Sequence, residues 1–142
     1  MIEAYFDGLY QEGIAAYGYV ILKDGKEIKT GCNIIDEGEG MTNNVAEYGG
    51  LIRVLQKLRT MRLRHEKITV YSDSMLVINQ MNWIWRLNAI LLIPLNKQAR
   101  QLAQDMNIEY KWVSRWNYQL SRADMLSRVA FRRYCTSRKG KT

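Results

Sequence analysis

Four acidic residues of this chain stand in local sequences that suit metal-assisted chemistry on phosphate esters. Asp7 and Asp73 each close a short apolar run, at residues 2–7 and 68–73, and Glu47 and Asp124 each lie in a segment that predicts a helix. Carboxylate oxygens are the ligands that Mg²⁺ prefers, and converging carboxylates can hold divalent ions that act on phosphodiesters. The four acids together therefore indicate a candidate metal site.

Each acid also has an ordinary structural explanation when it is taken alone. An Asp at a strand end is more often a turn or capping residue than a functional one. Glu47 fits the solvated face of a helix, and Asp124 fits a first-turn carboxylate that opposes the helix dipole. The functional interpretation therefore depends on the four acids together and on the residues around them.

The chain is basic, with 142 residues, a formal net charge of +7 and an isoelectric point of about 9.5. Its length fits one domain with its own core. The positive charge favours a polyanionic partner such as nucleic acid, although a basic surface that maintains solubility explains the charge equally well.

The few cysteine and histidine residues limit the kinds of disulfide, metal and catalytic site that this chain could form. Cys32 and Cys135 are far apart in the sequence and lack metal-ligand spacing. We therefore expect no disulfide framework, and we expect a cytoplasmic location. His65 is the sole histidine, which argues against a histidine-based zinc site or a Ser-His-Asp triad. We expect no signal peptide and no membrane association, because the apolar run at residues 87–95 is too short to span a bilayer.

The periodicity of apolar residues predicts elements in the order β-β-β-α-β-α-α-β-α. Strands are expected at residues 2–7, 15–23, 26–35, 67–71 and 108–113. Asp24-Gly25, between the second and third strands, is the strongest short hairpin signal. Helices are expected at residues 43–60, capped by Thr42 or Asn43, and at residues 74–81, about 94–106 and about 121–133.

This order predicts one mixed sheet with helices on its faces, because a set of antiparallel hairpins is followed by alternating strands and helices. If the strands that end at Asp7 and Asp73 are adjacent and parallel, both carboxylates emerge at the edge where α/β sheets bind ligands. Glu47 would lie about one turn into its helix, and Asp124 in the first turn of the last helix.

Four unpaired carboxylates at one place would repel and would raise one another's pKa values. Two divalent cations remove this repulsion. Two Mg²⁺ ions about 3.5–4 Å apart can activate a water molecule and stabilise the leaving oxygen of a phosphodiester.

The residues around the acids resemble the motifs of the type 1 ribonucleases H, in the short form that lacks a basic protrusion and a hybrid-binding domain. The matching segments, in order, are Tyr5-Phe6-Asp7-Gly8, Thr42-Asn43-Asn44 followed by Glu47, Tyr71-Ser72-Asp73-Ser74, and Ala123-Asp124-Met125. The second segment is the most specific, and the similarity runs from Met1 to about Tyr134.

The resemblance implies an α/β, ribonuclease H-like fold. Its five-stranded mixed sheet has strands 1–3 antiparallel, strands 4 and 5 parallel to strand 1, and helices on both faces. It also implies a metal-dependent endonuclease that hydrolyses the RNA strand of RNA–DNA hybrids, using two Mg²⁺ ions for which Mn²⁺ can substitute. Asp7, Glu47, Asp73 and Asp124 would hold the metals and form the catalytic set.

The resemblance assigns substrate contacts as well. The expected substrate-binding residues are Gly8, Thr42, Asn43, Asn44, Ser74 and Trp85. Thr42 would contact a phosphate of the DNA strand, and Asn43 and Asn44 would contact the minor groove near the 2′-hydroxyls of the RNA. Amide side chains both donate to and accept from a 2′-hydroxyl, the group that distinguishes RNA from DNA. Helix capping is the simpler explanation for the two asparagines, and it is compatible with substrate contact.

The chain departs from the family pattern in three places. Residues 9–14 replace the usual Gly/Pro-rich loop, which is expected to alter contacts with the minor groove. No histidine lies near Asp124, which leaves Arg115, Arg122 and Arg128 as candidates to assist product release. Asn117 lies too far upstream to match the family's asparagine, so residues 116–120 are interpreted as a small insertion.

Several aromatic and basic residues fit more than one role. For Trp83, Trp85, Trp112 and Trp116, core packing is favoured over stacking on sugars or bases, with Trp85 the nearest to the DNA strand. Trp83-Ile84 fits a subunit contact or an exposed patch. The basic residues between positions 57 and 67 fit either a solvated face or a phosphate-tracking surface. We expect a ribonuclease H domain at residues 1–134 and a basic, flexible tail at residues 135–142.

Other functions remain open at this point. A nuclease of the same fold that acts on DNA or on junctions would cleave all-DNA duplexes, and the Thr42-Asn43-Asn44 triplet argues against it. A catalytically weak hybrid-binding protein would bind without turnover, and the four retained acids argue against that. A basic α/β domain without a nucleic-acid role is the least favoured alternative. No obligate protein partner is evident.

Overall fold

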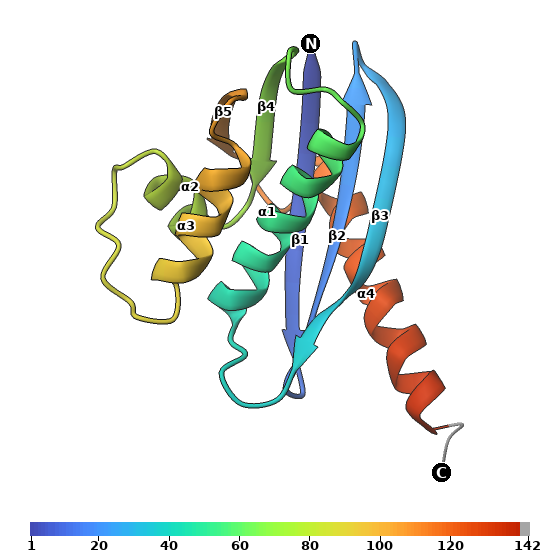
Figure 1. Ribbon diagram of the computed structural model, residues 1–142. Helices are drawn as coiled ribbons and strands as arrows, with labels where there is room; N and C mark the ends of the chain where they lie inside the picture. Colours follow the sequence, from blue (N-terminus) through green and yellow to red (C-terminus); the bar gives the residue numbers. More distant parts are fainter. Residues whose placement is uncertain (140–142) are drawn as a thin grey trace.

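A five-stranded mixed sheet forms the centre of the protein (Figure 1), in a computed structural model that describes residues 1–139. The strands are β1 (Ile2–Gln11), β2 (Ile14–Lys23), β3 (Lys26–Glu37), β4 (Lys67–Ser72) and β5 (Asn107–Trp112). They lie in the order β3-β2-β1-β4-β5. β1, β2 and β3 pair antiparallel, and β4 pairs parallel with both β1 and β5. The predicted sheet is therefore confirmed.

Helices cover both faces of this sheet, as predicted. They are α1 (Asn43–Thr60), α2 (Met75–Met81), α3 (Ile93–Leu102) and α4 (Tyr118–Lys139). The first three lie over one face, where residues such as Phe6, Leu51 and Leu55 form the larger core. On the other face α4 packs on a smaller core that includes Val20 and Leu120. None of the helices within residues 1–139 is both long and apolar enough to cross a membrane.

Two tight turns set the lengths of the first three strands. Asp24 and Gly25 have φ values of 50° and 81°, so the predicted hairpin is closed by two left-handed residues. Glu12 and Gly13 form a second turn of this kind, with φ values of 54° and 76°. Because of this second turn, β1 continues to Gln11, and the expectation that the first strand ends at residue 7 was wrong.

Helix α4 differs most from its predicted bounds. Asn117 caps it, because its side-chain oxygen accepts from the backbone N–H groups of Gln119 (3.0 Å) and Leu120 (3.1 Å). Residues 116–120, expected as an insertion, are therefore this cap, its preceding residue and the first helical turn. Asp124 is the seventh helical residue, so its expected place in the first turn was wrong. The helix also includes residues 135–139 of the expected tail, while residues 140–142 lie outside the described part.

The remaining boundaries shift by a few residues. α3 begins at Ile93, one residue before Pro94, and ends at Leu102 rather than near residue 106. The preference for core packing of the tryptophans was wrong, because all four indoles are exposed. Their exposed fractions are 73% for Trp83, 47% for Trp85, 47% for Trp112 and 78% for Trp116.

Candidate active site

The register of the two central parallel strands brings Asp7 and Asp73 together. The last residues paired between β1 and β4 are Tyr5 and Tyr71, whose rings stack at 4.5 Å. Asp7 lies two residues beyond Tyr5 on β1, and Asp73 lies two residues beyond Tyr71, directly after the end of β4. Both carboxylates therefore emerge at the carboxyl end of the β1–β4 pairing, although β1 itself continues along β2.

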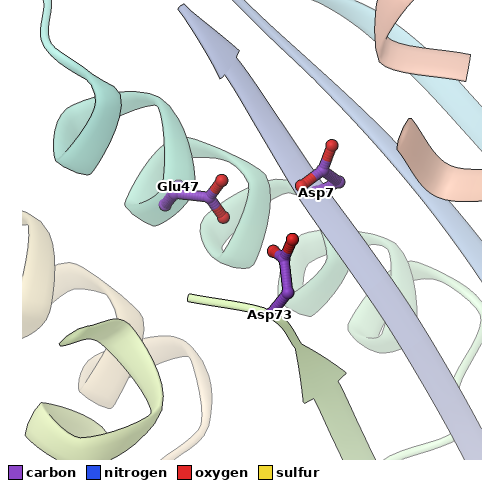
Figure 2. Close-up of side chains that lie close together, drawn as sticks. All are labelled: Asp7, Glu47 and Asp73. Carbon is purple, nitrogen blue, oxygen red and sulfur yellow. The ribbon is translucent and has the colours of Figure 1, made fainter. Parts of the chain in front are cut away.

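Glu47 joins them from α1 because that helix lies directly against β1. Gly8 makes this approach possible: a Cβ atom there would collide with the backbone carbonyl of Ala46. The backbone N–H of Gly8 donates to Glu47 Oε1 at 3.3 Å, which fixes the side chain. Carboxylate oxygens of Asp7, Glu47 and Asp73 all lie within 4.8 Å of one another (Figure 2).

Asp124 approaches from the opposite face of the sheet, on α4. Gly18 is the partner of Asp7 on β2, and a Cβ atom at Gly18 would collide with the backbone carbonyl of Ala123. The helix therefore rests on the sheet beside Asp7, and Asp124 lines the same cavity as the other three acids. It lies outside the tight group of three, and its Oδ2 accepts from Arg128 Nε at 3.1 Å.

Several hydrogen bonds hold the backbone around Asp73. The indole Nε1 of Trp112 donates to the carbonyl oxygen of Asp73 at 3.0 Å, and the N–H of Val113 donates to the carbonyl of Ser72 at 2.9 Å. Ser74 caps α2 by accepting from the N–H of Val77 at 3.3 Å. The position of Asp73 is therefore set jointly by β4, β5 and α2.

The crowded carboxyl groups bind protons tightly. Burial and the nearby charge of Asp73 raise the pKa of Asp7 to about 9, and its contact with Asp124 adds to this. Burial, with the charges of Asp7 and Asp73, raises the pKa of Glu47 well above its ordinary value. The pKa of Asp73 is also raised, mainly by burial. The site therefore has an excess of negative charge that a cation would neutralise.

The donor set fits a hard divalent cation. Within residues 1–139, Glu47 Oε2 is the one buried side-chain oxygen or nitrogen atom without a hydrogen-bond partner. Such an atom is costly to bury unless a partner is supplied. All the converging donors are carboxylate oxygens, which suit Mg²⁺, Ca²⁺ or Mn²⁺ rather than softer metals.

The other predicted site residues divide into two groups. Gly8 and Asn43 line the carboxylate cavity, which has a volume of about 460 Å³. The remaining four predicted substrate-binding residues are outside its lining: Thr42, Asn44, Ser74 and Trp85. Thr42 is the N-cap of α1, since its Oγ1 accepts from the N–H of Val45 at 3.2 Å. Asn44 is exposed beside it, whereas Trp85 lies in the connection between α2 and α3.

The cavity also contains residues to which the sequence gave no firm role. Arg115 and Trp116 follow β5, and the Arg115 guanidinium lies 4.6 Å from the centre of the Trp116 ring. Among residues 1–139, Arg115 forms no ion pair, whereas Arg128 is paired with Asp124. The place of Arg115 and Trp116 shortly after β5 was a usable signal in the sequence, because β5 is parallel to β4 and ends at the same edge of the sheet. Leu9 and Tyr10, in the extension of β1, line the cavity too.

Comparisons with known proteins agree with this geometry. Residues 5–130 match the model of the reverse transcriptase-like family. The bifunctional protein Rv2228c of Mycobacterium tuberculosis is 43% identical over 75 residues, which cover 52% of this chain. That match spans 20% of the mycobacterial protein, so the matched part of this chain covers about a fifth of the curated relatives' length.

Three solved structures extend the similarity over nearly the whole chain. RNase H1 from the archaeon Halobacterium salinarum superposes with a TM-score of 0.82 at 30% identity, covering 92% of this chain and 96% of the other. The N-terminal RNase H domain of Rv2228c from Mycobacterium tuberculosis also gives 0.82 at 30% identity, covering 96% and 99%. LC11-RNase H1, solved in complex with an RNA/DNA hybrid, gives 0.85 at 25% identity, covering 95% and 99%. The family model matches most of the chain, and the two RNase H structures at 30% identity cover more than nine tenths of it. This chain therefore belongs to the reverse transcriptase-like family and, within it, to the type 1 ribonucleases H.

Proposed function

We propose that this chain is a metal-dependent endonuclease that hydrolyses the RNA strand of RNA–DNA hybrids. The observation that carries the proposal is the group of three carboxylates within 4.8 Å, one of which has a buried oxygen without a partner. The relative LC11-RNase H1 was solved with an RNA/DNA hybrid, which supports the same substrate class for this chain.

We assign the metal site to Asp7, Glu47, Asp73 and Asp124, with two Mg²⁺ ions as the cofactor and Mn²⁺ as a substitute. Divalent ions in such a site neutralise charge on the scissile phosphate and activate water for attack on phosphorus. The β1–β4 register and the Gly8–Glu47 hydrogen bond support this assignment, because they bring Asp7, Glu47 and Asp73 together. Asp124 is placed by α4, and Arg128 holds its carboxylate.

Around the metal site, side chains of the cavity bind and orient the substrate. Asn43 lines the cavity beside Glu47, where its amide can donate to and accept from a 2′-hydroxyl of the RNA strand. Asn44 lies next to it and is exposed. The hydroxyl of Thr42 accepts from Val45, so its hydrogen stays available for a phosphate oxygen. Arg115 lines the cavity, forms no ion pair with any of residues 1–139, and supplies a cation for the substrate backbone.

Three weaker assignments complete the substrate contacts. Gly8 and Ser74 flank catalytic acids at the edge of the sheet, so that their backbones can approach the RNA strand. Trp85 exposes 47% of its surface and offers an aromatic face to the DNA strand.

Cys32 and Cys135 are free thiols, which fits activity in the cytoplasm.

The decisive experiment uses purified protein and an end-labelled RNA–DNA hybrid, beside all-DNA and all-RNA duplexes. We expect cleavage of only the RNA strand of the hybrid, with Mg²⁺ or Mn²⁺ and not with a chelator. Asp73→Asn should abolish cleavage without loss of folding, because it removes a ligand from an already repulsive cluster. Asp36→Asn, on the exposed end of β3, is the matched control.

Each alternative predicts a distinct outcome of that experiment. Comparable cutting of all-DNA duplexes would identify a nuclease that acts on DNA or junctions. Tight binding of the hybrid without any turnover would identify a binding protein. Calorimetric titration of Mn²⁺ into the metal-free protein tests the metal site without relying on activity, and unchanged Mn²⁺ affinity in Asp73→Asn would refute the ligand assignment.

A further inference from the structure

The stretch between Asp73 and Asp105 combines two unusual properties. It contains no acidic residue, whereas Arg86, Lys97 and Arg100 are basic. It also holds seven of the large apolar residues that are exposed: Met75, Trp83, Ile84, Trp85, Ile90, Leu91 and Ile93. Contiguous exposed apolar surface with a polar rim is typical of an interaction site in a folded protein.

Trp83 adopts a backbone conformation that an indole rarely takes. Its φ is 61°, at the position directly after the C-cap residue of α2. The N–H of Trp83 donates to Gln80 O at 3.1 Å and that of Ile84 to Asn79 O at 2.8 Å, the pattern that usually has glycine at this position. A non-glycine residue in this conformation is strained, yet the position displays a large side chain that is 73% exposed.

Arg100 holds the indole in place. Its guanidinium carbon lies 3.6 Å from the centre of the Trp83 ring. The same guanidinium donates to Asn96 Oδ1 at 2.8 Å and to the carbonyl oxygen of Gln80 at 2.8 Å. Asn96 is buried and donates in turn to the hydroxyl of Tyr48 at 3.0 Å. The exposed aromatic surface is therefore preorganised by a network that begins in the core, which lowers the entropy cost of binding a partner.

A groove of about 530 Å³ runs beside this pair. We call it the α2–α3 groove, and its lining residues are Trp83, Leu87, Ile93, Asn96, Lys97, Arg100, Gln101 and Gln104. None of them lines the carboxylate cavity. Among residues 1–139, Lys97 forms no ion pair and is exposed at the rim of the groove.

We propose that the α2–α3 groove binds an acidic, amphipathic segment of a partner protein. The aliphatic side chains Leu87 and Ile93 offer packing rather than stacking, and Arg100 already covers one face of Trp83, so the surface suits protein side chains better than nucleobases. Lys97 and Arg100 provide positive charge, and no acidic residue is among the residues that line the groove, so the partner contributes carboxylates. A second copy of this chain is disfavoured, since the same cations would face each other in a protein of net charge +7.

The test is fluorescence anisotropy of the full chain with a labelled peptide in which Asp and Glu alternate with Leu and Phe at helical spacing. The control peptide carries Lys in place of each acid. We expect binding of the acidic peptide only, weakened about tenfold by Ile93→Ser and by Lys97→Glu. Ile28→Ser and Lys29→Glu on β3 are matched controls, since Ile28 is 39% exposed against 44% for Ile93. Thermal melts confirm that the variants fold.

The alternatives give different results. Equal binding by the groove variants and the β3 variants, or no binding of the acidic peptide, would overturn the proposal. Displacement of the peptide by an RNA–DNA hybrid, with weaker hybrid binding in the groove variants, would assign the surface to nucleic acid instead. A concentration-dependent dimer that Ile93→Ser abolishes would assign it to a second copy. Cleavage of the hybrid is expected to be unchanged in Ile93→Ser, so this result is independent of the proposed nuclease activity.

Discussion

Asp7 and Glu47 are the residues at which folding most changes acid–base behaviour. In the folded protein the pKa of Asp7 rises from the ordinary 3.8 to about 9, and that of Glu47 is also raised, mainly because both carboxyl groups are buried. Each carboxyl is anionic in the unfolded chain at neutral pH. Between about pH 4 and pH 9, the metal-free folded state therefore binds more protons than the unfolded state.

This difference predicts how the stability of the metal-free protein depends on pH. The stabilising contribution of the protonated cluster is fully present below about pH 4 and is lost as the pH rises towards about 9. Urea unfolding in the presence of chelator should therefore show a free energy of unfolding that falls across this range. Saturating Mg²⁺ should reduce the slope, because the cation replaces the protons. Asp7→Asn should reduce it as well, and an equal slope in that variant would contradict the assignment.

A second prediction concerns Arg115 and its contact with the substrate. It lines the carboxylate cavity without an ion-pair partner among residues 1–139. A charge-assisted hydrogen bond to a phosphate contributes about 1.5–3 kcal/mol, so Arg115→Ala should lower kcat/KM by at least about tenfold. Because the contact is expected in both the bound substrate and the transition state, the change should appear mainly in KM. Arg132→Ala, an exposed residue of α4 outside the cavity, is the control, and an equal loss there would indicate only nonspecific charge.

The residue scale also shows where prediction from sequence succeeded. The meeting of Asp7 and Asp73 was predictable, because parallel pairing of two strands that end in acids determines it. The position of Asp124 was only partly predictable. The cap at Asn117 begins α4 earlier than expected, and the close packing of α4 depends on Gly18, far away in the sequence. Long-range contacts of this kind leave no local periodicity to detect.

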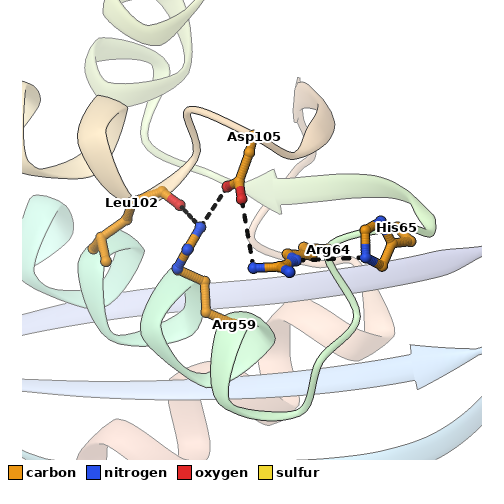
Figure 3. Close-up of polar contacts among 5 residues, drawn as sticks. All are labelled: Arg59, Arg64, His65, Leu102 and Asp105. Atoms are coloured by element: carbon orange, nitrogen blue, oxygen red, sulfur yellow. Dashed lines mark hydrogen bonds and ion pairs between the residues drawn. The ribbon is translucent and has the colours of Figure 1, made fainter.

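Among the elements, α1 ends in the same way as α2, with a large residue where glycine is usual. Arg62 has a φ of 59°, and the N–H of Leu63 donates to Leu58 O at 3.1 Å. Nearby, Arg59 and Arg64 both pair with Asp105 (Figure 3), so part of the basic cluster between residues 57 and 67 ties α1 to the α3–β5 connection. Arg62 itself has no ion pair within the described residues and is exposed.

Arg62→Gly should therefore stabilise the protein. Glycine relieves the left-handed strain of about 1 kcal/mol, and no ion pair is lost. We expect a rise in Tm of about 3 °C in a thermal melt. Arg64→Gly is the contrasting variant, because it removes an ion pair at a position without positive φ, and it should lower the Tm. A lower Tm in Arg62→Gly would mean that the Arg62 side chain makes a stabilising contribution of its own.

The turn between β1 and β2 shows why element boundaries were harder to predict than element types. Asp24-Gly25 was recognised because Asp commonly adopts the left-handed conformation, whereas Glu12-Gly13 was missed because Glu rarely does. The consequence is functional, since the extension of β1 carries Leu9 and Tyr10 into the lining of the carboxylate cavity. Local propensity alone cannot detect a turn that pairing of the flanking strands imposes.

At the scale of the whole molecule, the C-terminal end of the chain contributes to the net positive charge that favours binding of a polyanion. Arg138, Lys139 and Lys141 carry three of the 21 basic side chains. Arg138 pairs with Glu37 of β3 at 2.7 Å, and both side chains are substantially exposed. An exposed pair of this kind contributes about 0.2–1 kcal/mol, so residues 135–142 should matter less for folding than for affinity towards a polyanion.

Truncation after Tyr134 tests this division directly. We expect the shortened protein to fold, with a small decrease in stability, and to cleave the hybrid at low salt. Its affinity should be lower, and the slope of log K against log salt should become shallower by up to about 3, because as many as three phosphate contacts are lost. Replacement of Arg138, Lys139 and Lys141 by Gln in the full chain separates charge from length. If that variant keeps the full salt slope, these side chains make no contact with the hybrid; if the truncated chain fails to fold, the domain extends beyond residue 134, and the helical residues 135–139 are part of it.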